Sequence, residues 1–211
     1  MGLYMINKIP QAAVPRLSLY YRVLVESRGK DYVSSDELSK LTNFTAAQVR
    51  RDLTYFGQFG TPGKGYEVEA LKKAILSILG TDKNWDVVLA GVGNLGTALL
   101  SYKGFEKQGF KIICAFDNDL RRVGKTLEGI KIQDISELGN TVKERNISIG
   151  IVATPGEGAQ EVINILIKSG VKAILNFAPI RPQVPPSVGL LNIDLSIELE
   201  RLAYFLTKSK S

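Results

Sequence analysis

The sequence predicts an α/β fold: an N-terminal winged-helix unit, built around a helix-turn-helix, followed by a doubly wound parallel sheet of the Rossmann type. Two segments predict this fold. Residues 34–56 have the pattern of two short capped helices, with two adjacent arginines on the second. Residues 87–117 have the pattern of strand, glycine-rich turn, helix and strand, ending in an aspartate. The domains expected are residues 1–80, residues 85–190 and a C-terminal helical segment at 191–211.

The composition of the chain indicates two small domains, the first of them basic. The chain has 211 residues, of which 45% are hydrophobic, and this is enough for two small domains with cores of their own. The net charge is +6, and residues 1–66 hold nine Lys and Arg against five Asp and Glu. A basic N-terminal part favours a polyanionic partner, although a solvated basic surface would carry the same charge.

One cysteine and no histidine exclude several kinds of chemistry. A single Cys builds neither a disulfide framework nor a cysteine-rich metal site, and most zinc sites need His, so we expect no metal. Cys114 lies in the apolar run IICAF, which favours a buried core thiol over a redox sensor. No apolar run approaches the roughly 20 residues of a membrane span, and no signal peptide is evident. We therefore expect a cytoplasmic protein without membrane contact.

Three helices are predicted in the N-terminal part. Apolar residues recur at helical spacing in residues 15–28. Ser34-x-x-Glu37 and Thr45-x-x-Gln48 each have the pattern of a capping box, which marks the start of a helix. Two such starts eleven residues apart suit a helix-turn-helix, which we place within residues 17–56.

The second helix of this pair carries side chains suited to reading DNA. Gln48, Arg50 and Arg51 can point outward, and Gln and Arg contact adenine and guanine edges while Arg also holds phosphates. Four glycines and a proline in residues 57–68 predict a hairpin wing with Lys64 at its tip. A solvated helix in a small all-α domain is the alternative; a nucleotide P-loop is disfavoured because no Gly-Lys-Ser/Thr follows. The expected DNA contacts are Ser35, Thr45, Gln48, Arg50, Arg51, Lys64 and Tyr66.

The glycine-rich turn predicts a dinucleotide site. Gly91 permits a tight turn, Gly93 lets the backbone approach a pyrophosphate, and Gly96 lets the helix pack closely on the strand. Asp117 ends the next strand, where a carboxylate holds ribose hydroxyls, and its charge favours NAD over NADP. Arg121 and Arg122 weaken that preference because they are able to receive a 2′-phosphate.

Two later strands, residues 149–153 and 173–176, bring further residues to the same edge, because ligands sit at the carboxyl ends of the strands. An apolar nicotinamide pocket would be formed by Pro155, Phe177, Ala178 and Ile180. With no carboxylate obviously available, such a pocket should prefer the neutral ring of NADH to the cationic ring of NAD+. The expected cofactor contacts are Gly91, Val92, Gly93, Asn94, Leu95, Gly96, Asp117, Thr154, Pro155, Asn176, Phe177, Ala178 and Pro179.

The last predicted helix follows a Pro-rich link at residues 181–188. Leu195, Leu199, Leu202 and Leu206 form one apolar stripe. A helix this apolar is a candidate for docking on another subunit; the alternative is that it packs on its own domain.

These segments together resemble the Rex family of redox-sensing repressors. The matching segments are IPQAAVPRLSLYYRVL, AAQVRRDLTYFGQFG, GKGY, GVGNLG, AFD, ATPGEGAQ and NFAPI, in order and at similar spacing. The resemblance implies a homodimeric winged-helix repressor of palindromic operator DNA that NAD+ permits to bind and NADH releases. It also implies a domain-swapped C-terminal helix and a charged pair, Arg16 and Asp194, that switches between subunits. By the same resemblance Tyr102 is a further cofactor-binding residue, with a role in cofactor-dependent closure.

Two other functions remain to be weighed. An NAD-dependent dehydrogenase needs an acid/base near the hydride, but no His exists and no Tyr-x-x-x-Lys pair follows the glycine turn, so we expect no enzyme. A DNA-binding sensor of another nucleotide, such as a CoA, would share both halves of the pattern.

Overall fold

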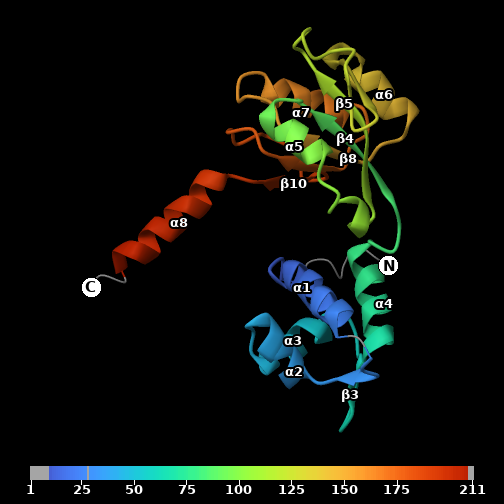
Figure 1. Ribbon diagram of the computed structural model, residues 1–211, viewed down its shortest axis with the longest axis vertical. Coiled ribbons are helices and arrows are strands. Elements are labelled where there is room, and N and C mark those ends of the chain that lie inside the picture. The colour runs from blue at the N-terminus through green and yellow to red at the C-terminus, as the bar shows by residue number, and fades with distance from the viewer. Residues whose placement is uncertain (1–9, 28, 209–211) are drawn as a thin grey trace. The chain divides into compact units, whose positions relative to one another are not determined.

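The computed structural model describes residues 10–27 and 29–208 (Figure 1). The chain forms two compact units, Met1–Lys83 and Asn84–Ser211. Arg28, the expected end of the first helix, lies outside the described residues, as do 1–9 and 209–211 of the predicted terminal domains. The units are joined between α4 (Val68–Leu79) and β4 (Trp85–Ala90).

The N-terminal unit is a helix-turn-helix followed by a small hairpin. The three strands form an antiparallel sheet in the order β1-β3-β2, and the β2–β3 hairpin is the predicted wing. Gly65 has a φ of +90°, and a Cβ there would lie 2.5 Å from the carbonyl oxygen of Val33, so only glycine fits beside β1. The elements are α1 (Ala13–Glu26), β1 (Tyr32–Val33), α2 (Ser35–Thr42), α3 (Ala46–Thr54), β2 (Gly60–Thr61), β3 (Gly65–Glu67) and α4.

The first predicted capping box is complete. The Ser34 side chain accepts a hydrogen bond from the Glu37 N–H at 3.1 Å, and the Glu37 carboxylate accepts one from the Ser34 N–H at 2.8 Å. The Lys30 ammonium, 2.6 Å from Glu37 Oε1, and then the Ser34 N–H lower the pKa of Glu37 to about 2.

The second box is only half formed. Thr45 accepts from the Gln48 N–H at 3.1 Å, but the Gln48 side chain donates to Asp52 and does not reach back to the cap. The sequence pattern therefore placed the start of α3 correctly but assigned the Gln48 side chain a wrong partner.

The C-terminal unit is a doubly wound α/β sheet. Its seven strands have the order β10-β9-β8-β4-β5-β7-β6, and all neighbouring pairs are parallel except β6–β7. The chain passes from β4 to β5 on one side and later returns to β8 on the other, so the switch point lies between β4 and β8. The elements after β4 are α5 (Asn94–Leu100), a 3-10 turn (Glu106–Gln108), β5 (Phe110–Asp117), β6 (Thr126–Leu127), β7 (Ile130–Asp134), a 3-10 turn (Ile135–Glu137), α6 (Leu138–Glu144), β8 (Ile149–Val152), α7 (Ala159–Lys168), β9 (Ala173–Asn176), β10 (Gly189–Asn192) and α8 (Leu195–Lys208).

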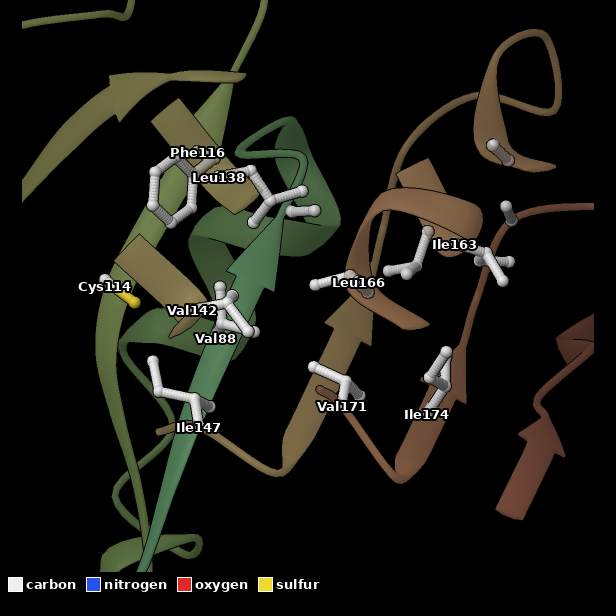
Figure 2. Close-up of a cluster of buried hydrophobic side chains, with 14 of the residues drawn as sticks. Val88, Cys114, Phe116, Leu138, Val142, Ile147, Ile163, Leu166, Val171 and Ile174 are labelled. Carbon is white, nitrogen blue, oxygen red and sulfur yellow. The ribbon is translucent and has the colours of Figure 1, made fainter. Parts of the chain in front are cut away.

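Both faces of the sheet are buried. Figure 2 shows one of them, where side chains of α6 and α7, including Leu138 and Leu166, pack against strand residues such as Val88 and Phe116. Cys114 belongs to this cluster, and burial raises the pKa of its thiol to about 11. The predicted core thiol is thereby confirmed.

Two features of this unit differ from the expectation. β10 pairs in parallel with β9 through Asn192, so the predicted segment boundary at residue 191 falls inside a strand of the sheet. The alternative that the last helix packs on its own domain is wrong, because α8 has no buried residue and its large apolar side chains are 50–68% exposed in the single chain.

Two glycines let three elements meet at the sheet edge. Gly91 has a φ of +93°, and a Cβ there would lie 2.7 Å from the backbone of Ala153, just after β8. A Cβ on Gly96 of α5 would collide with the carbonyl oxygen of Gly91. The atoms that a Cβ would meet belong to the backbone of Ala153 and Gly91. They cannot rotate away as the atoms of a flexible side chain could.

Gly96→Ala should therefore lower the free energy of unfolding by about 1–3 kcal/mol, the usual range for an overpacked site. Thermal unfolding followed by circular dichroism measures the change. Ser101→Ala, at the exposed end of the same helix, is the control and should change stability by no more than about 0.5 kcal/mol. Equal stability of the two variants would show that the helix shifts to accept the methyl group without strain.

Candidate nucleotide cavity and DNA-binding surface

A cavity of about 970 Å³ opens at the carboxyl edge of the sheet. The turns after β4, β5, β8 and β9 all contribute to its wall, as the topological switch point predicts. Its volume is within the range of cofactor sites. Eight of the predicted cofactor residues line it: Gly91, Gly93, Asn94, Leu95, Asp117, Thr154, Pro155 and Phe177.

Asp117 shapes the glycine turn as well as lining the cavity. Its Oδ2 accepts a hydrogen bond from the Val92 N–H at 2.7 Å, and its Oδ1 accepts one from the Asp119 N–H at 2.8 Å. The Arg122 guanidinium lies 3.4 Å from Oδ2. The carboxylate therefore ties β5 to the turn after β4.

The start of α5 is suited to an anion. The helix has no side-chain cap, and its first residues, Asn94 and Leu95, line the cavity. Beside Gly93 the space is open except for the Arg122 guanidinium, 3.5 Å from where a Cβ would stand. Free N–H groups and a nearby cation together attract a phosphate group.

Thr154 provides a second indication of a ligand. Its hydroxyl oxygen is buried, and within the described residues it has no hydrogen-bond partner. A buried hydroxyl without a partner is costly, and a polar ligand group in the adjoining cavity would remove that cost. The side chains at this edge therefore fit a dinucleotide.

Other predicted cofactor residues lie behind the cavity or away from it. Asn176 is 1% exposed, and its amide group donates to the Ala178 and Asn192 oxygens and accepts from the Ala178 N–H. It supports the turn that carries Phe177. Val92, Gly96 and Ala178 are buried, and Pro179 is exposed outside the cavity wall.

Tyr102 lies in a different place from the other predicted cofactor residues. It lines a separate cavity of about 330 Å³, together with Lys103 and Glu128. Its ring meets Phe105 edge-on with centroids 5.0 Å apart, lies directly against Gly104, and is 58% exposed.

The sequence analysis missed part of the cavity wall. Asp119 follows Asp117 by two residues, a spacing that could have revealed it; Arg121 binds its carboxylate with Nε and Nη2 at 2.9 Å each. Two exposed carboxylates, Glu157 and Glu161, also line the cavity, so the expectation that none is available there is wrong. The cavity residues not predicted as contacts are Asn118, Asp119, Arg122, Ile135, Ser136, Ala153, Glu157, Gly158, Glu161, Val162 and Ile165.

The predicted DNA contacts divide by exposure. Thr45, Arg51 and Lys64 are exposed, and the Lys64 ammonium lies over the Tyr32 ring, 5.9 Å from its centroid. Arg50 is exposed as well, but its Nη1 donates to the Ser35 hydroxyl at 2.8 Å and so joins α3 to α2.

Two of the predicted DNA contacts, Ser35 and Tyr66, are buried. Tyr66 is only 8% exposed because its ring packs in the core of the N-terminal unit. Ser35 is equally buried, at the start of α2. Neither side chain therefore adds to the exposed surface of the N-terminal unit.

Asp52, which the sequence analysis did not single out, is the best-connected polar residue of α3. Its carboxylate is fully buried and accepts hydrogen bonds from Arg16, Tyr20 and Gln48. Burial raises the pKa of Asp52, but these hydrogen bonds together outweigh it, and the pKa lies below its ordinary value. Asp194 accepts from the Ser196 N–H at 2.9 Å, and the Arg16 guanidinium binds Asp52.

Within the described part of the chain, no helix is long and apolar enough to cross a membrane. In the same residues no three acidic or cysteine side chains gather closely enough to hold a metal ion.

Both halves of the chain match known families. A model described as a CoA binding domain matches residues 82–180, and one described as the N-terminus of a putative DNA-binding protein matches residues 8–54. The redox-sensing transcriptional repressor Rex of Desulforamulus reducens is 44% identical, over 94% of this chain and 96% of that protein. Rex 1 of Thermotoga maritima is 42% identical, over 98% of this chain and 100% of that protein.

Solved structures agree. The crystal structure of RSP with β-NAD+ and operator DNA is 37% identical, has a TM-score of 0.92, and covers 96% of this chain and 94% of its own. RSP, described as a Rex-family repressor, is also known in complex with β-NADH, with a TM-score of 0.86 at 36% identity over 96% of both chains. With relatives this similar over nearly the whole length, and with a winged helix joined to a dinucleotide-type sheet, the chain belongs to the Rex family of redox-sensing transcriptional repressors, which are not enzymes.

Proposed function

We propose that this chain binds palindromic operator DNA as a homodimer when it holds NAD+ or no nucleotide, and that NADH releases it. The observation that carries the proposal is the cavity at the carboxyl edge of the sheet, with its unpartnered Thr154 hydroxyl and uncapped α5. RSP, 37% identical, has been crystallised with NAD+ and operator DNA, and also with NADH. Operator binding implies action in the cytoplasm.

Different residues of the cavity suit different parts of a dinucleotide. The pyrophosphate would meet the backbone at Gly93 and the start of α5, with Arg122 beside it. Asp117 and Asp119 would accept hydrogen bonds from ribose hydroxyls, and both would repel a 2′-phosphate.

The two redox forms differ in the charge of the nicotinamide ring. Pro155 and Phe177 give the cavity an apolar part that favours the neutral ring of NADH. Glu157 and Glu161 would favour the cationic ring of NAD+, but both are exposed, and solvent weakens their effect. If the closed form of the dimer buries the ring more fully, NADH shifts the population toward it.

The dimer would form through α8. Leu195, Leu199 and Leu202 lie on one helix and are more than 60% exposed in the single chain, so a second copy is the expected cover. In such a dimer Asp194, just before α8, would approach Arg16 of the other copy. That contact would compete with Asp52 for the guanidinium. Tyr102, exposed beside its own small cavity, would take part in closure.

A second candidate ligand follows from the family model over residues 82–180, whose description names CoA. CoA shares the adenosine and pyrophosphate groups of NAD, and the same glycine turn would receive both. The RSP complexes favour NAD.

Titration of each nucleotide into the protein–operator complex, followed by fluorescence anisotropy, tests the proposal. We expect NADH to release the DNA, whereas NAD+ and CoA leave it bound, because only NADH carries the neutral ring. NADPH should act at least about tenfold more weakly than NADH because of Asp117 and Asp119. If CoA released the DNA and NADH did not, CoA would be the ligand in place of NADH.

The salt dependence of operator binding tests the DNA surface. Replacing Arg51 and Lys64 together by Ala should reduce the slope of log affinity against log salt by about four units, about one for each of the four phosphates that the dimer no longer neutralises. Lys131→Ala removes an exposed cation of the C-terminal unit and should leave the slope unchanged. A double variant with the wild-type slope would place the DNA on a different surface.

Analytical ultracentrifugation tests the dimer. Leu199→Asp with Leu202→Asp should convert dimer to monomer and weaken operator binding, since each chain would then meet only one half-site. These side chains are exposed in the single chain, so its fold should persist, as circular dichroism would show. Glu200→Gln, on the same helix, should remain dimeric; a dimeric double variant would show that α8 is not the interface.

A further inference from the structure

Every hydrogen-bonding position around the Asp52 carboxylate is filled by a side-chain donor. Oδ2 accepts from Arg16 Nε at 2.5 Å and from the Tyr20 hydroxyl at 2.8 Å. Oδ1 accepts from Arg16 Nη2 at 2.7 Å and from Gln48 Nε2 at 2.7 Å. Arg16 and Tyr20 belong to α1, whereas Gln48 lies on α3 with Asp52 itself.

Three of these four bonds serve an ordinary purpose. A buried charge needs a partner, and Arg16 with Tyr20 neutralises Asp52 and fastens α3 to α1. The fourth bond, from Gln48, is not needed for that purpose, and it engages a residue at the part of α3 best placed for DNA. Gln48 is the third residue after the Thr45 cap, in the first turn of the helix, and its side chain is partly exposed. In helix-turn-helix proteins this first turn of the second helix meets the base edges.

The chemistry of the two groups fixes the orientation of the Gln48 amide. An ionised carboxylate only accepts hydrogen bonds, so it attracts the NH₂ end of the amide and repels the oxygen end. If the amide rotated by half a turn, its Oε1 would face Oδ1 of Asp52 across 2.7 Å, with two acceptors and no proton between them. The lowered pKa of Asp52 keeps the carboxylate ionised at neutral pH.

The amide then retains one N–H and the oxygen Oε1 for another partner. A donor and an acceptor side by side are the groups with which glutamine binds N7 and the N6 amino group of adenine. We propose that Asp52 is a positioning residue that fixes the Gln48 amide for adenine, and so sets one base preference in each half of the operator. The inference rests on the proposed DNA-binding function.

In vitro selection from a random duplex pool, read by sequencing, provides the test. The wild-type protein, without nucleotide, should select a palindrome with an adenine at one defined position of each half-site. Gln48→Ala should lose the preference at that position alone. Asp52→Asn keeps the size of the side chain but is able to donate as well as accept, so both amide orientations become possible. It should weaken the same preference by about ten- to a hundredfold.

Tyr20→Phe is the matched control. It removes one hydrogen bond from Asp52 without touching Gln48, so the adenine preference should persist even if stability falls. A folded Asp52→Asn that keeps the preference, or that weakens all positions alike, would overturn the inference. If wild-type protein selects no sequence at all, the proposed DNA-binding function itself fails.

A second measurement covers the case in which Asp52→Asn does not fold. In the wild-type protein the two side-chain amide protons of Gln48 are separate NMR signals, assigned by their loss in Gln48→Ala. One should be protected from solvent exchange in the free protein, and the other should gain protection only on the operator. Equal exchange of both protons in the free protein would contradict a fixed amide.

Discussion

The candidate nucleotide cavity depends on Gly91 and Gly96, two positions that have no Cβ. Gly91 allows the turn after β4 to touch the backbone after β8, and Gly96 allows α5 to touch that turn. These approaches bring the turn after β4, the start of α5 and the end of β8 close enough to line one cavity. A methyl group at either position would push backbone against backbone. Thr154, which directly follows Ala153, is positioned by this contact.

The two units use buried aspartates in the same way. Asp117 accepts from the Val92 N–H and holds the glycine turn, and Asp52 accepts from Gln48 and holds a side chain of α3. In both cases a carboxylate that only accepts hydrogen bonds orients a donor group beside an expected binding surface. Each unit also pairs its aspartate with an arginine, Arg122 in one and Arg16 in the other.

Local signals in the sequence located the starts of helices and the glycine turn, whereas side-chain contacts with other partners, that of Gln48 with Asp52 included, were not predicted. Ser34-x-x-Glu37 and the glycine turn describe contacts within a few residues, and both predictions were confirmed. Asp52 and Arg16 are 36 positions apart, and no spacing rule connects them. β10 follows a Pro-rich link, and it pairs with β9 in the sheet. The sequence around the link therefore gave no sign of this strand. Tyr66 follows Lys64 and Gly65 and was therefore expected to be an exposed wing residue. Successive side chains of a strand point to opposite faces, and in β3 the Tyr66 side chain points into the core.

The chain has no histidine, the side chain whose ordinary pKa lies closest to neutrality, and its one thiol has its pKa raised to about 11. Neither imidazole nor thiolate chemistry therefore responds when the pH becomes mildly acidic or alkaline. A regulator built in this way keeps nucleotide binding separate from the two side-chain titrations that most often make a protein sensitive to pH near neutrality.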